Sequence, residues 1–422
     1  MGPRLEVVVI ADDLTGAADT GVQFAAIGHP VYLTPVEHIG LEAPRRDAAA
    51  SLAVYTHSRH LCAAAAAARL RSTAQALPSP RPRWVYKKID SCLRGNPGAE
   101  IDVLIDTLGF HAALVAPALP AQGRTTIQGV HRVHGVPLTA TEFARDPVAP
   151  VTRSAVAAVL SSQSRHAVGH IHIHEYGDLG HLGRALEREC ARGCRLIVCD
   201  ATAQTHLDQV AELVVRSPRP LLPVGSAGLA ASLARQLSPS ATGRLEECPR
   251  LEQLLLICGT GSPVTREQVA VLLGRYRGVR RELDPVWLAR ASAVERRRCA
   301  GELTRAWADG VLALQLRSLP PAVGPVSPSA AARGLARLGC ELVRASGVEV
   351  LFLSGGDTAA AFFGACGAQA IRLQREVLPG LVLGRWLGGP ADGLPVITKA
   401  GAFGEAKTLM LLYAQLSGGI AS

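Results

Sequence analysis

The chain has 422 residues, 48% of them hydrophobic. Domains typically contain about 100–200 residues, so the sequence predicts two or three folded domains and excludes a largely disordered chain. The formal net charge of +9 is spread along the chain without a basic stripe that also carries aromatic residues, which argues against nucleic acid as a partner. No apolar run approaches the roughly 20 residues that span a bilayer, and no signal-peptide pattern is present, so we expect a cytoplasmic protein with no membrane partner.

Short apolar, β-branched runs alternate with Ala-, Leu- and Arg-rich segments of helical period. The predicted strands are residues 7–10, 53–55, 84–86, 113–115, 196–199, 254–258 and 348–353. The predicted helices are residues 17–26, 63–76, 99–108, 182–191, 265–273, 330–345 and 359–365. Strands that alternate with helices are typical of parallel sheets covered on both faces, so we expect an α/β fold with mainly parallel sheets.

The clearest domain boundary is a turn-rich, polar and aperiodic segment before a new predicted strand. It predicts an N-terminal domain over residues 1–236, a linker over 237–250 and a C-terminal domain over 251–422. The Pro-rich stretch 319–328 is interpreted as a surface loop of the second domain.

Two aspartates, Asp12 and Asp13, come directly after the first predicted strand. In parallel α/β sheets ligands bind at the carboxyl ends of strands, so the pair lies where chemistry is expected. The alternative is that one of them caps the following helix.

A dense set of polar residues occupies the turn after the strand at 84–86. Its members are Lys88, Asp90, Ser91 and Arg94, and Arg59 follows a neighbouring predicted strand. So many donors suit an anion such as a substrate carboxylate, although a solvated charged turn would look similar. The Pro- and Gly-rich segment 116–147 is too long for an ordinary connection and predicts a functional loop.

Two side-chain clusters could suggest a metal, but neither pattern favours one. His170, His172 and His174 alternate, which we interpret as an edge or partly exposed strand. The ten cysteines include no CxxC pair, and the spacing of those at 190, 194 and 199 is not usual for zinc, so we expect reduced thiols. No protein metal site is predicted.

Three glycine-rich turns lie in the second half of the chain. The first carries Thr260 and Ser262 before Pro263, a residue favoured at the first position of a helix. The others are Gly355-Gly356-Asp357-Thr358 and the turn with Lys399 and Gly401. Glycines let a backbone approach phosphates, and helix N-termini offer free N–H groups. Neither a Walker A motif nor a GxGxxG fingerprint is present.

Lysine is rare, because only four of the 44 basic residues are lysines: Lys87, Lys88, Lys399 and Lys407. Lysine is a compact point charge on a flexible stem, whereas arginine is a planar fork. We interpret the four as positions where geometry excludes arginine, with chance survival as the alternative.

Taken together, these motifs resemble the four-carbon acid sugar kinases over essentially the whole chain. The motifs that carry the resemblance are ADDLTGAADTG, YKKIDSCLRGNPGAE, PALPAQGRTTIQGVHRVHGVPLTATEFARDP, VGSAGLA, SGGDT and TKAGAFG, in the family's order. The KIDSCLRG and GSAGLA forms look more like the threonate and erythronate kinases than the 3-oxo-tetronate kinases.

The resemblance implies a substrate-binding domain followed by a nucleotide-binding domain, with the active site in the cleft between them. It implies transfer of the γ-phosphate of ATP, with Mg²⁺, to the terminal O4 hydroxyl of D-threonate or D-erythronate, or alternatively of 3-oxo-tetronate. The implied substrate-binding residues are Asp12 or Asp13, Arg59, Lys88, Ile89, Asp90 and Ser91, and Arg94 joins them as a ligand of the substrate's carboxylate or hydroxyls. Either aspartate is the expected catalytic group. The expected cofactor-binding residues are Thr260, Ser262, Gly355, Gly356, Asp357, Thr358, Lys399 and Gly401.

This chain departs from the family pattern at a few positions. Family members commonly have Thr in place of Cys92 and Glu in place of Asp357, and the shorter carboxylate at 357 would shift any contact to Mg²⁺ or its waters. The remaining alternatives are a nicotinamide-dependent oxidoreductase and a non-catalytic acid-sugar sensor. The sequence does not fix the oligomeric state, and a homodimer is one assembly to test.

Overall fold

The computed structural model describes residues 5–40, 50–146, 149–237, 251, 253–307, 309–317 and 327–418. The chain divides into two units, Met1–Gly243 and Arg244–Ser422. Nearly all of the predicted linker and most of the predicted loop 319–328 lie outside the described residues. The domain boundaries at 236 and 250 therefore stay predictions.

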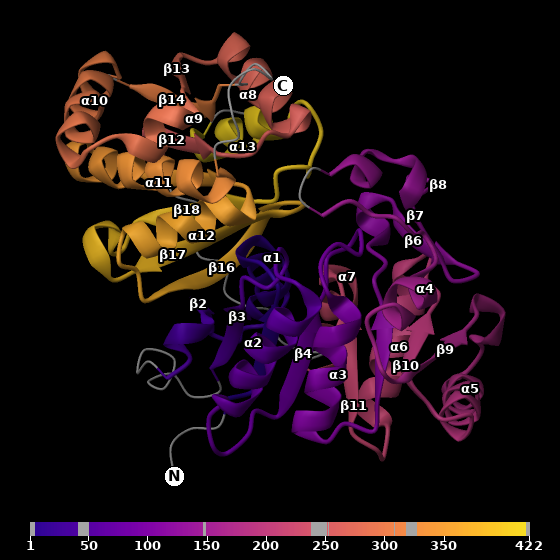
Figure 1. The fold of residues 1–422 in the computed structure, drawn as a ribbon. Coiled ribbons are helices and arrows are strands. Elements are labelled where there is room, and N and C mark those ends of the chain that lie inside the picture. Colours follow the sequence, from indigo (N-terminus) through magenta and orange to yellow (C-terminus); the bar gives the residue numbers. More distant parts are fainter. Residues whose placement is uncertain are drawn as a thin grey trace. The chain divides into compact units, whose positions relative to one another are not determined.

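The first unit is a parallel α/β unit (Figure 1, indigo to magenta). Its strands are β1 (Val7–Ala11), β2 (Val31–Pro35), β3 (Ser51–Tyr55), β4 (Trp84–Lys88), β5 (Ala112–Ala116), β6 (Arg124–Ile127), β7 (Val130–Val133), β8 (Val136–Pro137), β9 (Ala167–Ile171), β10 (Cys194–Cys199) and β11 (Leu221–Gly225). Its helices are α1 (Leu14–Ala25), α2 (Ala63–Gln75), α3 (Pro97–Leu108), α4 (Val156–Ser161), α5 (Leu179–Ala191), α6 (Gln204–Arg216) and α7 (Ala227–Leu237).

The main sheet of this unit has the strand order β2-β3-β1-β4-β11-β5-β10-β9, and every neighbouring pair is parallel. Two rows of helices pack beside it, one formed by α2, α3 and α4 and the other by α1, α7, α6 and α5. Strands β1, β3 and β5 are buried along their whole length, as expected for a parallel sheet covered on both faces.

The segment predicted as a long functional loop is folded. It forms the small antiparallel sheet β6-β7-β8 with short 3-10 turns around it. The β6–β7 connection consists of Gln128 and Gly129, which both have positive φ values of 52° and 73°. A two-residue turn with positive φ at both positions matches the twist of a tight hairpin.

The second unit is also α/β (Figure 1, orange to yellow). Its strands are β12 (Gln253–Cys258), β13 (Gly278–Leu283), β14 (Gly310–Leu316), β15 (Val350–Ser354), β16 (Ala370–Leu378), β17 (Leu381–Leu387) and β18 (Pro395–Lys399). Its helices are α8 (Pro263–Arg275), α9 (Pro285–Arg290), α10 (Ala293–Ala306), α11 (Pro328–Ala345), α12 (Gly356–Ala365) and α13 (Thr408–Leu416).

Its strand order is β13-β14-β12-β15-β18-β17-β16, parallel as far as β18 and antiparallel beyond it. Helices α8 and α13 pack against one face, where Leu272 and Leu412 join Leu256 in the core. Helices α11 and α12 pack together beside the other face, where Gly339 lets Ile257 and Phe362 approach closely. Cys340 on α11 and Cys366, the C-cap residue of α12, form a disulfide, whereas reduced thiols were expected. In the part of the chain that the structure describes, no helix is long and apolar enough to span a membrane.

A buried ion pair ties β4 to α3. The ammonium of Lys87 lies 2.6 Å from Glu100 Oε2, and both side chains are almost completely buried. Glu100 also accepts a hydrogen bond from Ser58, one residue before Arg59. The pair therefore joins the ends of β3 and β4 through α3.

Replacing Lys87 by Met should lower the free energy of unfolding by about 3–5 kcal/mol, because it leaves the charge of Glu100 buried without a partner. Denaturant unfolding would measure the loss, and Lys87→Met with Glu100→Leu should recover part of it. As a control, Arg298→Ala breaks the exposed pair with Glu302 and should cost less than about 1 kcal/mol. Equal losses for the two single variants would contradict the prediction.

Candidate active site

The predicted substrate residues of the first unit meet at the carboxyl ends of three neighbouring strands. Arg59 follows β3, the aspartates Asp12 and Asp13 follow β1, and Asp90 follows β4. Because β2 and β3 lie on one side of β1 and β4 lies on the other, β1 and β4 form a topological switch point. Ligands of open α/β sheets bind outside such a point.

Arg59 connects the two aspartates that follow β1. Its Nε donates to Asp12 Oδ2 at 2.7 Å and its Nη2 to Asp12 Oδ1 at 3.0 Å. Its Nη1 and Nη2 also donate to the two carboxylate oxygens of Asp13, at 3.0 and 2.8 Å. Asp90 Oδ1 lies 3.6 Å from the same guanidinium, whose side chain is only 11% exposed. One guanidinium thus contacts all three carboxylates of this site, and its single positive charge offsets part of their negative charge.

The charges of this cluster set its protonation. Burial alone would raise the pKa of Asp12, but Arg59, Lys87 and Lys88 outweigh it and hold the pKa below its usual value. For Arg59 the directions are reversed. Burial alone would lower the pKa of Arg59, but Asp12, Asp13 and Asp90 outweigh burial and hold that pKa well above its usual value. Asp12 is therefore an anion and Arg59 a cation at neutral pH.

The two aspartates have different roles. Asp13 caps α1, because its Oδ1 accepts the Gly16 N–H at 3.0 Å and its Oδ2 accepts the Thr15 hydroxyl at 2.8 Å. A Cβ on Gly16 would lie 2.6 Å from Asp13 Oδ1 and 3.0 Å from Lys88 Nζ, so only glycine fits there. The capping alternative raised by the sequence thus holds for Asp13, which leaves Asp12 as the stronger catalytic candidate.

The turn after β4 is organised by Asp90. Its carboxylate accepts from Arg94 Nε at 2.9 Å and Nη2 at 3.0 Å, and from the Cys92 N–H at 3.2 Å. Burial raises the pKa of Asp90, but Arg94 and Arg59 outweigh it and hold the pKa well below its usual value. Arg94 also donates to Asp146 at 3.0 Å, and its guanidinium lies 5.5 Å from the centre of the Phe143 ring.

His131 is a residue of the site that the sequence did not single out. It lies on β7 and is fully buried, with Nε2 2.7 Å from the carbonyl oxygen of Ser91 and Nδ1 2.9 Å from the Thr126 hydroxyl. Burial lowers its pKa to about 4, so the ring is neutral and Nε2–H donates to Ser91. In the sequence His131 is a single histidine in a partly polar run, as is His134 three positions later. The sequence pattern therefore could not indicate which of the two histidines belongs to the site.

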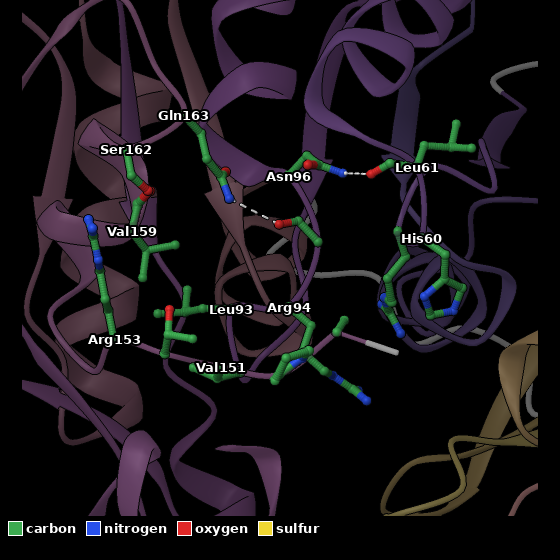
Figure 2. A pocket seen from close by; sticks show the side chains of 15 residues that line it. His60, Leu61, Leu93, Arg94, Asn96, Val151, Arg153, Val159, Ser162 and Gln163 are labelled. Carbon is green, nitrogen blue, oxygen red and sulfur yellow. Dashed lines mark hydrogen bonds between the residues drawn. The ribbon is translucent and has the colours of Figure 1, made fainter. Parts of the chain in front are cut away.

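A cavity of about 340 Å³ opens beside Arg59 and Arg94 (Figure 2). Two side chains that line the cavity donate hydrogen bonds to backbone carbonyls. The Asn96 side chain donates to the carbonyl of Leu61 at 2.8 Å, and the Gln163 side chain donates to the carbonyl of Gly95 at 3.1 Å. Arg153 and His60 also line it, and none of its described lining residues is acidic. The cavity therefore suits an anion.

In the second unit the three predicted glycine turns follow three adjacent strands, β12, β15 and β18. A Cβ on Gly259 would lie 2.2 Å from Thr358 Oγ1, and one on Gly401 would lie 2.4 Å from Thr260 Oγ1. Gly355 has φ +100°, a conformation that side chains rarely adopt. The structure therefore brings all three turns into one site.

The groups at this site are mostly backbone and small side chains. Ser262 and Gly355 are the N-cap residues of α8 and α12, and the Ser262 N–H donates to Thr260 Oγ1 at 3.1 Å. Asp357 is exposed in the first turn of α12. Such a cradle fits the phosphates of ATP, and an exposed carboxylate oxygen suits Mg²⁺, which usually takes one or two carboxylates together with phosphate oxygens.

Lys399 stabilises the turn that contains Gly401 through hydrogen bonds from its buried ammonium. The residue is 1% exposed. Its ammonium donates to the carbonyls of Ala400, Gly401 and Phe403 at 3.0, 3.3 and 3.0 Å, and to Thr265 Oγ1 at 3.2 Å. Burial lowers its pKa to about 8. A direct contact with ATP stays a prediction, and the observed contacts favour a positioning role.

Comparison with known proteins agrees with this division into two kinds of site. Residues 7–233 match a sugar-binding N-terminal domain and residues 255–409 match a nucleotide-binding C-terminal domain. The chain is thus an α/β protein with one domain of each kind, as predicted.

Relatives of known class extend the match over nearly the whole chain. The D-threonate kinase of Salmonella typhimurium is 35% identical over 96% of this chain and 97% of its own length. The D-erythronate kinase of Heliobacterium modesticaldum is 32% identical over 95% of this chain and 94% of its own. The chain therefore belongs to the four-carbon acid sugar kinase family and is an ATP-dependent enzyme of that family.

A solved structure shows the same fold. A Salmonella typhimurium protein described as a putative tRNA synthase superimposes with a TM-score of 0.79, covering 96% of this chain and 98% of its own. Its sequence is 24% identical, so the likeness supports the fold alone.

Gly401→Ala should weaken ATP binding by about fivefold to a hundredfold, because overpacking typically costs about 1–3 kcal/mol and 1.4 kcal/mol corresponds to tenfold in affinity. Gly364→Ala is a matched control on α12, since its Cβ would meet no atom within 4 Å. Calorimetric titration with ATP would compare the two variants. Unchanged affinity in Gly401→Ala would remove the turn from the nucleotide site.

The free energy of unfolding should fall as the pH drops from about 6.5 to 4. In the unfolded chain His131 is protonated near its ordinary pKa of 6.5, whereas in the folded chain it is protonated only near pH 4. The contribution of His131 to the free energy of unfolding is therefore complete above pH 6.5 and is lost as the pH falls toward 4. The loss attributable to His131 is up to about 3 kcal/mol. His131→Gln should flatten this pH dependence in denaturant unfolding, and an unchanged slope would contradict the assignment.

Proposed function

We propose that the protein phosphorylates the terminal O4 hydroxyl of D-threonate or D-erythronate. The observation that carries the proposal is the cavity beside the Asp12–Arg59 cluster, whose described lining contains arginines and no acidic side chain. The names of the relatives support a four-carbon acid as the occupant. The alternative within the family remains 3-oxo-tetronate.

The substrate carboxylate would bind the basic lining, where Arg94 and Arg153 reach the cavity from different segments. The guanidinium of Arg59 is already shared between Asp12 and Asp13, so we propose that it holds these carboxylates and adds a positive potential. Lys88, Ile89, Asp90 and Ser91 would contact the hydroxyls, with His131 fixing the Ser91 backbone.

Asp12 would accept a hydrogen bond from the attacking hydroxyl. Because its pKa is held below the usual value, Asp12 is a weak base, and we propose that it mainly orients the hydroxyl. Phosphoryl transfer places few demands on a base, since its transition state is loose and positioning dominates. The bond between O4 and the γ-phosphorus forms, and the bond between the γ-phosphorus and the oxygen that bridges the β- and γ-phosphates breaks. ADP is the leaving group, and the hydroxyl proton is released to solvent.

ATP would bind the three glycine turns of the second unit. Thr260, Ser262, Gly355, Gly356, Thr358 and Gly401 would surround the phosphates, and Lys399 would hold the turn that contains Gly401. Asp357 would hold Mg²⁺ or its waters, and the ion would supply charge neutralisation at the phosphates. Cytoplasmic location and homodimer formation stay predictions.

An ADP-release assay with ATP and Mg²⁺ tests the function. D-threonate, D-erythronate, L-threonate and 3-oxo-tetronate should each be offered, and we expect turnover with one of the first two. Phosphorus NMR of the product would identify O4 as the site. Turnover with 3-oxo-tetronate alone would move the enzyme to the other branch, and failure of all four acids would overturn the proposed substrate.

Asp12→Ala should lower kcat by about 10²-fold, because the attacking hydroxyl loses the acceptor that orients it. Asp13→Asn is the comparison, since an amide oxygen can still cap α1 and the folding of that helix should survive. Circular dichroism would check folding in both variants. A wild-type kcat in Asp12→Ala would exclude Asp12 from the chemistry.

A further inference from the structure

A second cluster of ligand-type side chains lies at the far end of the first unit's sheet. His170 is on β9, the last strand of the sheet order, and His172 follows it just before a short 3-10 helix at Ile173–Glu175. Asp200 follows the neighbouring strand β10. One ligand atom from each of the three residues lies within 4.8 Å of the others, and the two imidazole centres are 3.9 Å apart.

Asp200 is a buried carboxyl group that has no arginine or lysine partner among the described residues. Its side chain is 2% exposed, and it accepts the N–H groups of Gln128 and Gly129 at 2.7 and 2.9 Å and His170 Nε2 at 2.9 Å. In the described part of the chain His170 is its only ion-pair partner. Asp12, Asp13 and Asp90 are each paired with arginine, so Asp200 differs in lacking a permanent cation.

We propose that His170, His172 and Asp200 bind a divalent transition-metal ion of the zinc class. Two imidazoles and one carboxylate are ligands that suit zinc and cobalt, and three protein ligands leave a position for water. Binding replaces the His170–Asp200 hydrogen bond with bonds to the ion and supplies the positive charge that Asp200 lacks. The site involves none of the residues assigned to ATP, Mg²⁺ or the acid sugar.

The ion would secure the β6–β7 turn. Asp200 holds both residues of that turn, and His170 packs closely against it, since a Cβ on Gly129 would lie 3.2 Å from the ring. Strand β7 in turn carries His131, which donates to Ser91. We therefore expect the ion to stabilise the small sheet that supports the predicted substrate loop.

The test uses full-length protein without a polyhistidine tag, stripped of metal by a chelator. Calorimetric titration with Zn²⁺ should show one ion per chain, and Co²⁺ should give the visible absorption of a low-coordinate site. His172→Ala should weaken Zn²⁺ binding by roughly tenfold or more, because loss of a ligand costs at least as much as loss of an outer-shell partner. This variant leaves the contacts of Asp200 with His170 and the turn intact.

The control is His181→Ala. His181 on α5 forms an exposed pair with Asp178, the N-cap residue of that helix. The pair resembles the His170–Asp200 pair but belongs to no three-residue cluster in the described chain. Zn²⁺ should raise the melting temperature of wild type and His181→Ala, but not that of His172→Ala. Wild-type affinity in His172→Ala, or an equal loss in His181→Ala, would mean adventitious surface binding and overturn the proposal.

Discussion

The sharing of one guanidinium between two carboxylates is the constraint on which the first unit's site depends. Buried charges are costly unless they are paired and hydrogen-bonded, and the fork of Arg59 satisfies four carboxylate oxygens at once. A lysine could not do this, since its ammonium is a point charge. Because Asp12 and Arg59 come from different strands, their pairing also fixes how the ends of β1 and β3 lie. The site is thus built by the same contacts that hold the sheet edge together.

The scarcity of lysine indicated which lysine positions are structurally constrained, but it did not indicate which groups these lysines contact. Lys87, Lys88 and Lys399 are buried, as expected where arginine cannot fit, whereas Lys407 is exposed and consistent with chance survival. Lys87 binds Glu100, and Lys399 binds three carbonyl groups of the turn that follows it. The sequence placed Lys399 at a phosphate loop but could not show that its ammonium points into the protein. One of the four groups that the ammonium contacts is the Thr265 hydroxyl, 134 residues away in the chain.

The main strands could be predicted because apolar, β-branched runs of parallel strands are buried on both faces. The same reasoning failed for β6, β7 and β8, which are two to four residues long and partly polar. Their hairpin depends on a turn held by Asp200, about 70 residues further along the chain. His131 was missed for the same reason, since its role comes from a contact with Ser91 that no local pattern encodes. Tertiary contacts, and not local propensity, define this part of the site.

In the proposed sites, the two units would bind anions in different ways. The first unit would use charged side chains, but most of them are already paired with one another. A substrate would therefore be recognised by the groups that line the cavity and by the remaining electrostatic field of the cluster. The second unit would use backbone N–H groups, glycines and hydroxyls, with Lys399 holding the carbonyl groups of the turn that contains Gly401. Backbone donors at helix N-termini bind phosphate without fixing the identity of the rest of the ligand. Specificity for the acid should therefore depend on the first unit, where a change of one residue alters both charge balance and shape.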